Sequence, residues 1–320
     1  MAELTYHFEN AEIAREALGG DEKKSRILEE KLNIKVISRD GWIKFEGNPS
    51  KIELAQRFIE VIETSVRDGQ RVRTREFARS LEMMSEEGLE AMVACIKDSI
   101  STSSKKAPIR PRTGGQKRYI DIIRKNTITF GLGPAGTGKT YLAMAMAVSS
   151  LKAGEVTRII LSRPAVEAGE ALGFLPGALE EKISPYLRPL YDALHDMLPA
   201  EELQKYQERG VVEIAPLAYM RGRTLNNSFV ILDESQNATR EQMLMFLTRM
   251  GSESKLVVTG DPSQVDLPMH RKSGLVEAAK KLDDIDGIGV HRFLKKDVVR
   301  HRLVQSIIQA YEEPNQNGHL

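Results

Sequence analysis

A run of eight residues at 133–140, GPAGTGKT, combines glycines with a lysine and a hydroxyl side chain at fixed spacing. It fits the pattern G-x-x-x-x-G-K-[ST], in which glycines let consecutive backbone N–H groups turn toward bound phosphates. In that pattern the lysine reaches the β- and γ-phosphates and the hydroxyl binds Mg²⁺. The expected nucleotide contacts are Gly133, Pro134, Ala135, Gly136, Thr137, Gly138, Lys139 and Thr140, with Thr140 also expected to bind Mg²⁺.

Two carboxylates, Asp233 and Glu234, directly follow the apolar run FVIL at 229–232. An apolar strand that ends in acids is the expected second half of a phosphate-loop site, where the first acid holds Mg²⁺. The next acid is placed to act as general base on the attacking water. We therefore expect Asp233 to be a second metal residue and Glu234 to be catalytic, as is Lys139. Two solvent-exposed acids at a strand end are the alternative.

Three further residues are candidates for nucleotide contacts. Gln264, in the polar stretch that follows the strand at 255–259, could sense the γ-phosphate. Gln116 and Tyr119 precede the first strand of the same region, where a glutamine could read the adenine edge and a tyrosine could stack on the ring. The guanine-selecting signature N-K-x-D is absent from the sequence, which favours ATP over GTP. The expected cofactors are therefore ATP and Mg²⁺.

Several arginines lie beside predicted strand ends or helix starts, where one could stabilise the charge on a transferred phosphoryl group. Such an arginine can come from the same chain or from a neighbouring subunit, and a salt bridge is the ordinary alternative for each. The candidates are Arg163, Arg221, Arg223 and Arg300.

The composition sets broad limits on function. The formal net charge of the 320 residues is +1, so any attraction for nucleic acid must be local. A single cysteine, Cys95, excludes an intrachain disulfide and suits a reducing compartment. The N-terminus lacks the pattern of a signal peptide, and no apolar run approaches membrane-spanning length. We therefore expect a cytoplasmic protein with no membrane contact.

From residue 116 to 311 the sequence alternates between strand and helix patterns, which predicts an α/β domain with a parallel sheet and helices on both faces. Ligands of such sheets bind at the carboxyl ends of the strands. The predicted strands are 126–132, 156–162, 211–214, 228–233, 255–259 and 288–293. The predicted helices are 138–152, 177–197, 239–250, 273–282 and 297–311.

Residues 1–66 predict a separate small α+β domain with the order β-α-α-β-β-α. This order resembles that of a KH domain, an RNA-binding module whose GXXG loop joins its first two helices. The corresponding stretch, 19–22, reads GGDE, so it lacks the second fixed glycine and carries two acids. Lys23 and Lys24 follow and could compensate for these acids. RNA binding and a purely structural role both remain open for this domain.

Residues 67–115 predict a helical and basic linker, and residues 312–320 a disordered tail. The stretch 99–118 contains six basic residues and no acidic one, with Ser, Pro and Gly between them. Such a stretch is typical of a connection between domains, and its charge could also contact nucleic-acid phosphates. The sequence favours neither interpretation over the other.

Residues 113–310 resemble the PhoH-like ATPase family. The resemblance rests on GPAGTGKT (133–140), SRPAVEAGE (162–170), LGFLPG (172–177), PYLRPLYDAL (185–194), MRGRTLNNSFVILDESQNAT (220–239) and TGDPSQVDLP (259–268). It implies a RecA-like P-loop NTPase fold, Mg²⁺-dependent ATP hydrolysis and a link to RNA metabolism. It also implies a ring oligomer and an endoribonuclease partner in ribosomal RNA maturation. The same resemblance assigns the sensor role to Gln264 and adenine contact to Gln116.

Superfamily 1 helicases place nucleotide between two RecA-like domains, whereas this sequence has room for one. A single domain can complete its site by using a neighbour's surface, so we predict a closed homo-oligomer, hexameric, with an arginine supplied in trans. Arg300 is the first candidate for this catalytic arginine and Arg221 the second.

Two functional hypotheses follow. The first is Mg²⁺-dependent ATP hydrolysis coupled to remodelling of RNA or ribonucleoprotein, in the manner of a helicase. The alternative is a nucleotide-gated oligomeric adaptor that recruits an endoribonuclease without unwinding. A small-molecule kinase fits less well, because the Asp-Glu pair at the strand end is suited to polarising water.

Overall fold

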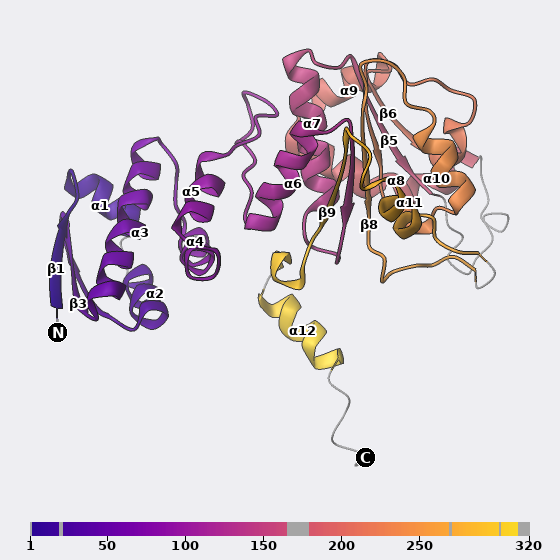
Figure 1. Cartoon of the computed structure of the whole chain (residues 1–320). Coiled ribbons are helices and arrows are strands. Elements are labelled where there is room, and N and C mark those ends of the chain that lie inside the picture. The colour runs from indigo at the N-terminus through magenta and orange to yellow at the C-terminus, as the bar shows by residue number, and fades with distance from the viewer. Residues whose placement is uncertain (1, 19–21, 165–178, 269–270, 301, 313–320) are drawn as a thin grey trace, which may run out of the picture. The chain divides into compact units, whose positions relative to one another are not determined.

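The computed structural model describes residues 2–18, 22–164, 179–268, 271–300 and 302–312. The chain divides into two compact units, and Figure 1 labels their elements. The first unit runs to Ser99 and also takes in Arg110–Lys117, while the second contains Ile100–Ile109 and continues from Arg118. None of the helices in the described ranges is long and apolar enough to cross a membrane.

The first unit begins with the predicted order β-α-α-β-β-α. Its three strands form an antiparallel sheet in the order β1-β3-β2. Asn48 caps the third helix by accepting a hydrogen bond from the backbone N–H of Ser50 at 3.0 Å, and Pro49 occupies the first turn. The elements are β1 (Ala2–His7), α1 (Ala11–Leu18), α2 (Lys23–Leu32), β2 (Lys35–Arg39), β3 (Trp42–Gly47) and α3 (Pro49–Arg67).

Two more helices, α4 (Thr74–Glu87) and α5 (Leu89–Lys97), pack into the same core. Phe77 of α4 is fully buried against Phe58 of α3, with ring centroids 4.9 Å apart in an edge-to-face contact. Met92 and Cys95 of α5 are buried in the same cluster. The predicted domain end at residue 66 was therefore wrong, because α4 and α5 belong to the first unit and not to a linker. Each helix buries an apolar face opposite the charged residues that suggested a solvated segment.

Lys24 has a structural role in this unit. Its ammonium donates hydrogen bonds to the backbone oxygens of Glu16, Ala17 and Val72 at 3.2, 2.8 and 2.7 Å. Two of these oxygens belong to the last turn of α1, where carbonyls lack partners within the helix. Because Lys24 is buried, it does not compensate for the acids of the preceding loop, as the sequence suggested. The glycines and aspartate of that loop, 19–21, lie outside the described residues.

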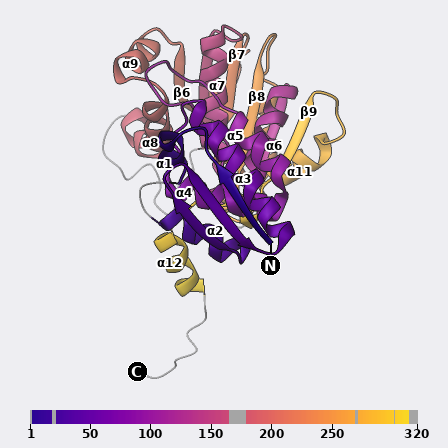
Figure 2. The same cartoon turned by 90° about the vertical axis from the view of Figure 1, so that its left-hand side faces the viewer.

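The second unit contains the predicted parallel sheet. Within the described residues it has six strands in the order β6-β5-β7-β8-β4-β9, with every pairing parallel. Figure 2 shows β6, β7, β8 and β9 across this sheet. All six predicted strands are confirmed. They are β4 (Ile128–Leu132), β5 (Arg158–Arg163), β6 (Val212–Pro216), β7 (Ser228–Leu232), β8 (Lys255–Gly260) and β9 (Ile288–Arg292).

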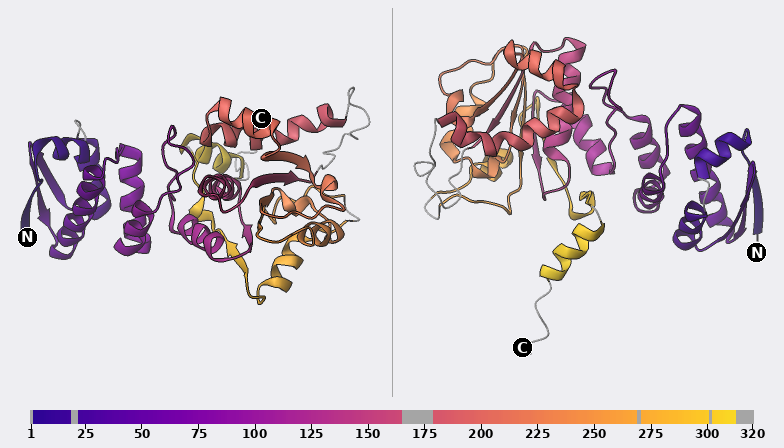
Figure 3. Two further views of the ribbon diagram at one scale, coloured as in Figure 1. Left: turned by 90° about the horizontal axis from the view of Figure 1, so that it is seen from above. Right: turned by 180° about the vertical axis from the view of Figure 1, so that it is seen from behind.

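Helices cover both faces of this sheet (Figure 3). Phe229 and Ile231 of β7 face a core shared with α6, α7, α8 and α9, while Val230 and Leu232 face a core shared with α10 and α11. Strands buried on both faces are continuously apolar, which explains the FVIL run. The helices are α6 (Gly114–Lys125), α7 (Lys139–Ala153), α8 (Leu179–Met197), α9 (Ala200–Glu208), α10 (Arg240–Leu247), α11 (Leu275–Leu282) and α12 (Arg302–Glu312).

The strand order brings the polar ends of three strands together. β8 lies between β4, which leads into the phosphate-binding loop, and β7, which leads into Asp233 and Glu234. The carboxyl end of β5, at Arg163, lies on the other side of β7. The crevice at this edge is where parallel α/β sheets bind ligands.

Tyr119 packs inside the second unit. Its side chain is fully buried on α6, 5.1 Å from the Phe293 ring and 5.8 Å from the His291 ring, measured between ring centroids. It lies against the backbone of β4 at Gly131, where a Cβ atom would be 2.7 Å from the tyrosine ring. Tyr119 is therefore a core residue, and its predicted stacking on adenine was wrong. The helical pattern of α6 places it on the buried face.

Substitution of Tyr119 by phenylalanine is expected to leave the free energy of unfolding unchanged or raise it by up to about 1 kcal/mol. The Tyr119 hydroxyl is buried and has no hydrogen-bond partner among the described residues, and burial raises its pKa. Chemical denaturation measures the change, and nucleotide affinity serves as the control and should match wild type. A marked loss of stability would show that the hydroxyl has a partner.

His291 is expected to make stability depend on pH between 6.5 and 4. Burial lowers the pKa of the imidazole from 6.5 to about 4, with Arg118 acting in the same direction and Asp297 opposing it. A lowered pKa in the folded state means that the unfolded chain binds more protons in this range, so stability falls as the pH falls from 6.5 toward 4.

In His291→Leu this contribution should disappear. The difference in unfolding free energy between the variant and wild type, measured at several pH values, should change between pH 6.5 and 4 and be flat above 7. A constant difference over that range would contradict the assignment.

Candidate functional site

The phosphate-binding loop connects β4 to α7. Gly136 and Gly138 have φ values of +86° and +82°, in the left-handed region that glycine adopts without strain. Lys139 then begins the helix, whose N-terminal N–H groups favour an anion. The loop borders a cavity of about 250 Å³. The lining residues are Ala135, Gly136, Gly138, Lys139, Thr140, Tyr141, Asp233, Glu234, Gly260, Asp261 and Gln264.

Lys139 supplies the cation of this cavity. Its ammonium donates hydrogen bonds to the backbone oxygens of Gly133 and Pro134 at 2.7 and 2.9 Å. Burial lowers the pKa of Lys139, and Asp261, Glu234 and Asp233 act in the opposite direction. The side chain is thus held at the loop as a desolvated cation, which suits it to bind phosphate oxygens.

Thr140 and Asp233 contact each other in the lining of the cavity. The Thr140 hydroxyl donates to Oδ1 of Asp233 at 2.5 Å, and the Thr259 hydroxyl donates to the same oxygen at 2.9 Å. Hydroxyl and carboxylate oxygens suit Mg²⁺, which uses few protein ligands together with phosphate oxygens and water. Within the described ranges no group of three or more His, Cys, Asp or Glu residues could hold a metal by itself. Thr140 and Asp233 would therefore hold Mg²⁺ together with the nucleotide, where it would neutralise phosphate charge.

Glu234 lines the cavity in a strained backbone conformation. Its φ of +50° is in the left-handed region, which a non-glycine residue rarely adopts and which often marks a functional site. Oε2 accepts a hydrogen bond from the Gln236 amide at 2.6 Å, and Oε1 lies 3.4 Å from the Arg163 guanidinium. Both carboxylate oxygens are thus engaged in this conformation.

Gln236 and Asp261 connect the ends of the three strands. The side-chain oxygen Oε1 of Gln236 accepts a hydrogen bond from the backbone N–H of Asp261 at 3.1 Å. Oδ2 of Asp261 accepts from the Ala135 N–H of the phosphate-binding loop at 3.2 Å. Gln264 follows on the same turn and lines the cavity. Its backbone N–H donates to the backbone oxygen of Asp261 at 3.0 Å.

Sequence reasoning missed Thr259 and Gln236. Thr259 is the last polar residue before the end of β8, and Gln236 stands two residues after Glu234. The position of β8 between β4 and β7 could have identified Thr259, but this order is not visible in the sequence.

Arg300 lies on the phosphate-binding loop of its own chain. Its guanidinium donates to the Ala135 oxygen at 2.8 Å, and the N–H of Val299 donates to the Gly136 oxygen at 2.9 Å. The sequence analysis proposed Arg300 as an arginine acting from a neighbouring subunit, whereas in this structure it contacts the loop of its own chain. The last helix begins at Arg302 and not at 297, because Lys295–Asp297 form a short 3₁₀ helix and Val299 and Arg300 then contact the loop.

The other arginines differ in their surroundings. Arg223 pairs with both carboxylate oxygens of Glu213, at 2.5 and 2.7 Å, and this contact raises its pKa. Arg221 is exposed. Arg163 contacts Glu234 as described above. The motif residues 165–178 lie outside the described residues.

Gln116 belongs to the first unit. Its side chain is buried, and its carbonyl oxygen accepts a hydrogen bond from the backbone N–H of Arg112 at 2.7 Å. The side chain is therefore engaged in a contact within that unit, and adenine recognition by Gln116 stays a prediction.

The fold and the site together define a class of protein. A parallel α/β sheet carries a phosphate-binding loop after one strand and an Asp-Glu pair after another, with a third strand between them. This is the arrangement of a P-loop nucleoside triphosphatase.

The chain belongs to the PhoH-like protein family, whose model matches residues 108–312. A PhoH-like protein of Bacillus subtilis is 47% identical over 98% of both chains. A PhoH-like protein of Mycobacterium bovis is 52% identical over 93% of this chain and 85% of its own. The protein PhoH of Escherichia coli is 45% identical over 70% of this chain and 62% of its own.

Two solved structures align with the chain at 15% identity and a TM-score of 0.36. They are the Hef helicase domain of Pyrococcus furiosus and the SWI2/SNF2 ATPase core of Sulfolobus solfataricus in complex with dsDNA. They cover 57% and 60% of this chain, and 38% and 46% of their own chains. A likeness of this size carries no argument about function.

Proposed function

We propose that this protein hydrolyses ATP with Mg²⁺ and uses the reaction to remodel RNA or ribonucleoprotein. The observation that carries the proposal is the 2.5 Å contact between Thr140 and Asp233, one residue from Glu234. This contact joins the two halves of the proposed Mg²⁺–triphosphate site, and the Glu234 carboxylate lines the same cavity. A protein that only binds nucleotide has no need of a general base at that position.

The link to RNA rests on what the resemblance in the sequence implies and on the first unit. That unit has the element order and the antiparallel three-stranded sheet on which the KH resemblance rests. The buried position of Lys24 removes one cation from its RNA-binding capacity, whereas the basic stretch 99–118 supplies six basic residues.

The test is ATP turnover by the full chain with and without single-stranded RNA. The proposal expects hydrolysis that RNA accelerates several-fold. Turnover that RNA does not change would contradict the coupling to RNA, and absence of turnover despite ATP binding would contradict the proposed hydrolysis.

A nucleotide-gated adaptor that recruits an endoribonuclease is the second candidate. The observation that favours it is the engagement of both Glu234 oxygens by Gln236 and Arg163, which would slow hydrolysis until they are released. Slow turnover would then serve as a timer. A strand-displacement assay separates the two functions, because only the first expects unwinding.

We also propose a hexameric ring. A single domain of this kind leaves its nucleotide cavity open on one side, and a neighbour could close it. Arg221 is the remaining candidate for an arginine supplied in trans, because Arg223 is paired with Glu213 and Arg300 lies on its own loop. Sedimentation over a range of concentrations tests the assembly, and full activity of a monomer would contradict it.

A further inference from the structure

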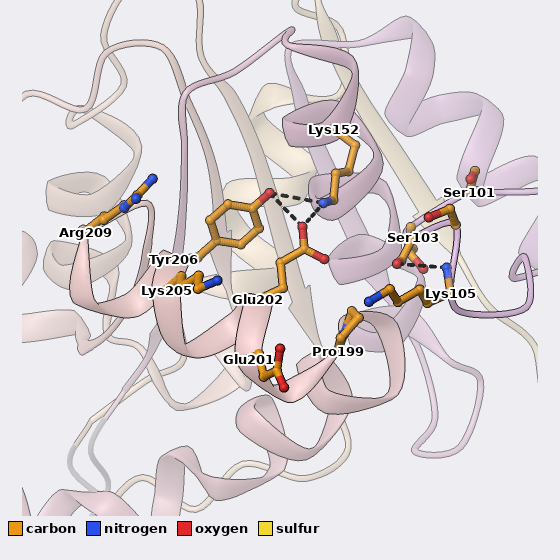
Figure 4. A pocket seen from close by; sticks show the side chains of 12 residues that line it. Ser101, Ser103, Lys105, Lys152, Pro199, Glu201, Glu202, Lys205, Tyr206 and Arg209 are labelled. Atoms are coloured by element: carbon orange, nitrogen blue, oxygen red, sulfur yellow. Dashed lines mark hydrogen bonds and ion pairs between the residues drawn. The ribbon is translucent and has the colours of Figure 1, made fainter.

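The second unit has another cavity, of about 610 Å³, outside the nucleotide site (Figure 4). Its wall is formed by the loop 101–105, by Lys152 at the end of α7 and by residues of α9. Lys139 and Lys152 lie thirteen residues apart on α7, so the two cavities are separated by about 20 Å along this helix. Nothing in the proposed ATP chemistry uses this second cavity.

The cavity has an excess of positive charge. Four cationic side chains, Lys105, Lys152, Lys205 and Arg209, line it together with Glu201 and Glu202. Lys152 forms an ion pair with Glu202 and donates to the Tyr206 hydroxyl at 3.1 Å. Within the described part of the chain, Lys205 and Arg209 have no ion pair. In Figure 4 Lys105 and Lys205 lie on opposite sides of Glu202.

A buried hydroxyl in the wall is without a partner. Thr102 is 1% exposed, and its Oγ1 forms no hydrogen bond with any described residue. An unsatisfied buried hydroxyl destabilises the fold, and an acceptor atom of a ligand bound in this cavity would satisfy it. Ser101, Ser103 and Ser104 add further hydroxyl groups beside it.

We propose that this cavity binds the sugar–phosphate backbone of a single strand of RNA. The inference rests on the proposed function and names the site at which the RNA binds. Hydroxyl and cationic side chains bind phosphate oxygens irrespective of base sequence. Lys205 of α9 and Arg209, the C-cap residue of this helix, are four residues apart and therefore lie on the same side of it, as binding along an extended RNA backbone requires.

The part of the basic stretch 99–118 that belongs to the second unit supports an RNA strand over a small anion. Lys105 comes from this stretch and lines the cavity, so the stretch that the sequence left as linker or phosphate contact forms one wall of the site. The next residue, Lys106, adds a cation of the same unit outside the cavity lining, where its ammonium donates to the His195 backbone oxygen at 2.9 Å. A charge spread along a surface suits a polymer, whereas a small anion needs cations that converge on one point.

The first measurement is the affinity of the full-length protein for a fluorescent single-stranded RNA at several salt concentrations. The double variant Lys205→Gln/Arg209→Gln should bind RNA at least tenfold more weakly at low salt. Each phosphate contact adds about 0.7 to the slope of log K against log salt, so the slope should become shallower by about 1.4. Lys125→Gln/Lys280→Gln is the matched control, since it removes two charges from exposed positions outside the cavity and should bind like wild type.

Thr102→Val gives an independent test, because valine keeps the shape and removes the hydroxyl. It should weaken RNA binding by about fivefold while its thermal stability is unchanged or higher. Turnover of ATP without RNA should be unchanged in all these variants, which shows that the nucleotide site is intact.

The outcomes separate the site from the function. If wild type binds RNA and both cavity variants bind equally well, the proposed site is wrong and the proposed function stands. If wild type does not bind RNA, both are wrong. If the cavity variants lose binding of tripolyphosphate but keep their affinity for RNA, the cavity binds a small anion and the RNA proposal is overturned.

Discussion

Replacing Glu234 by glutamine is expected to lower ATP turnover by about 10²- to 10⁴-fold while ATP affinity stays close to that of wild type. Glutamine keeps the size of the side chain and can still contact Gln236, but it cannot accept a proton from water. Lys139, Thr140 and Asp233, which would hold the triphosphate and Mg²⁺, are unchanged. Binding and hydrolysis should therefore separate in this variant.

The measurement is steady-state phosphate release together with the affinity for a fluorescent ATP analogue. Glu253→Gln is a matched control, because Glu253 is also a glutamate with a positive φ, +53°, but is exposed and lies outside the cavity. It should retain wild-type turnover. A Glu234→Gln variant that hydrolyses ATP at more than a tenth of the wild-type rate would show that another group is the base.

Replacing Arg300 by alanine is expected to lower turnover by about 10³-fold or more, the effect of losing an arginine that stabilises charge on the transferred phosphoryl group. The guanidinium contacts Ala135, which lines the nucleotide cavity, and no other subunit is needed to bring it there. Arg300→Lys should restore little of the activity, because a lysine lacks the planar set of donors.

Mixing experiments decide whether this arginine acts within its own chain. Arg300→Ala and Glu234→Gln subunits are dissociated, mixed and reassembled. If both groups act in the same cavity of the same chain, every mixed assembly contains only defective sites and activity stays low. Recovered activity on mixing would mean that Arg300 completes a neighbour's site, and the arrangement in this structure would not be the active one. Arg221→Ala, an exposed position, is the comparison for an arginine in trans.

The phosphate-binding loop and the Asp-Glu pair could be predicted from the sequence because each is a local pattern. In each case an apolar run predicts a buried strand, and the small or polar residues that follow it predict the functional group at the end of that strand. Glycines at 136 and 138 permit the positive φ that the loop adopts. The alternation of strands and helices was likewise sufficient to predict a parallel sheet with two covered faces.

Contacts between distant segments were decided only by the tertiary structure. The insertion of β8 between β4 and β7 brings Thr259 to Asp233, and the residues before α12 bring Arg300 back to the loop after more than a hundred residues. The local sequence pattern around Tyr119 was compatible with contact to a nucleotide or with a place in the core, and its burial in the tertiary structure shows that it is a core residue.

The sequence by itself therefore determined the phosphate-binding loop and the Asp-Glu pair, because each lies in a short run whose backbone geometry is local. The tertiary structure decided which side chains restrain Glu234, on which chain's loop Arg300 lies and where α4 and α5 pack. The physical reason is that these outcomes depend on strand order and on the burial of apolar faces, which arise from interactions among segments far apart in the chain.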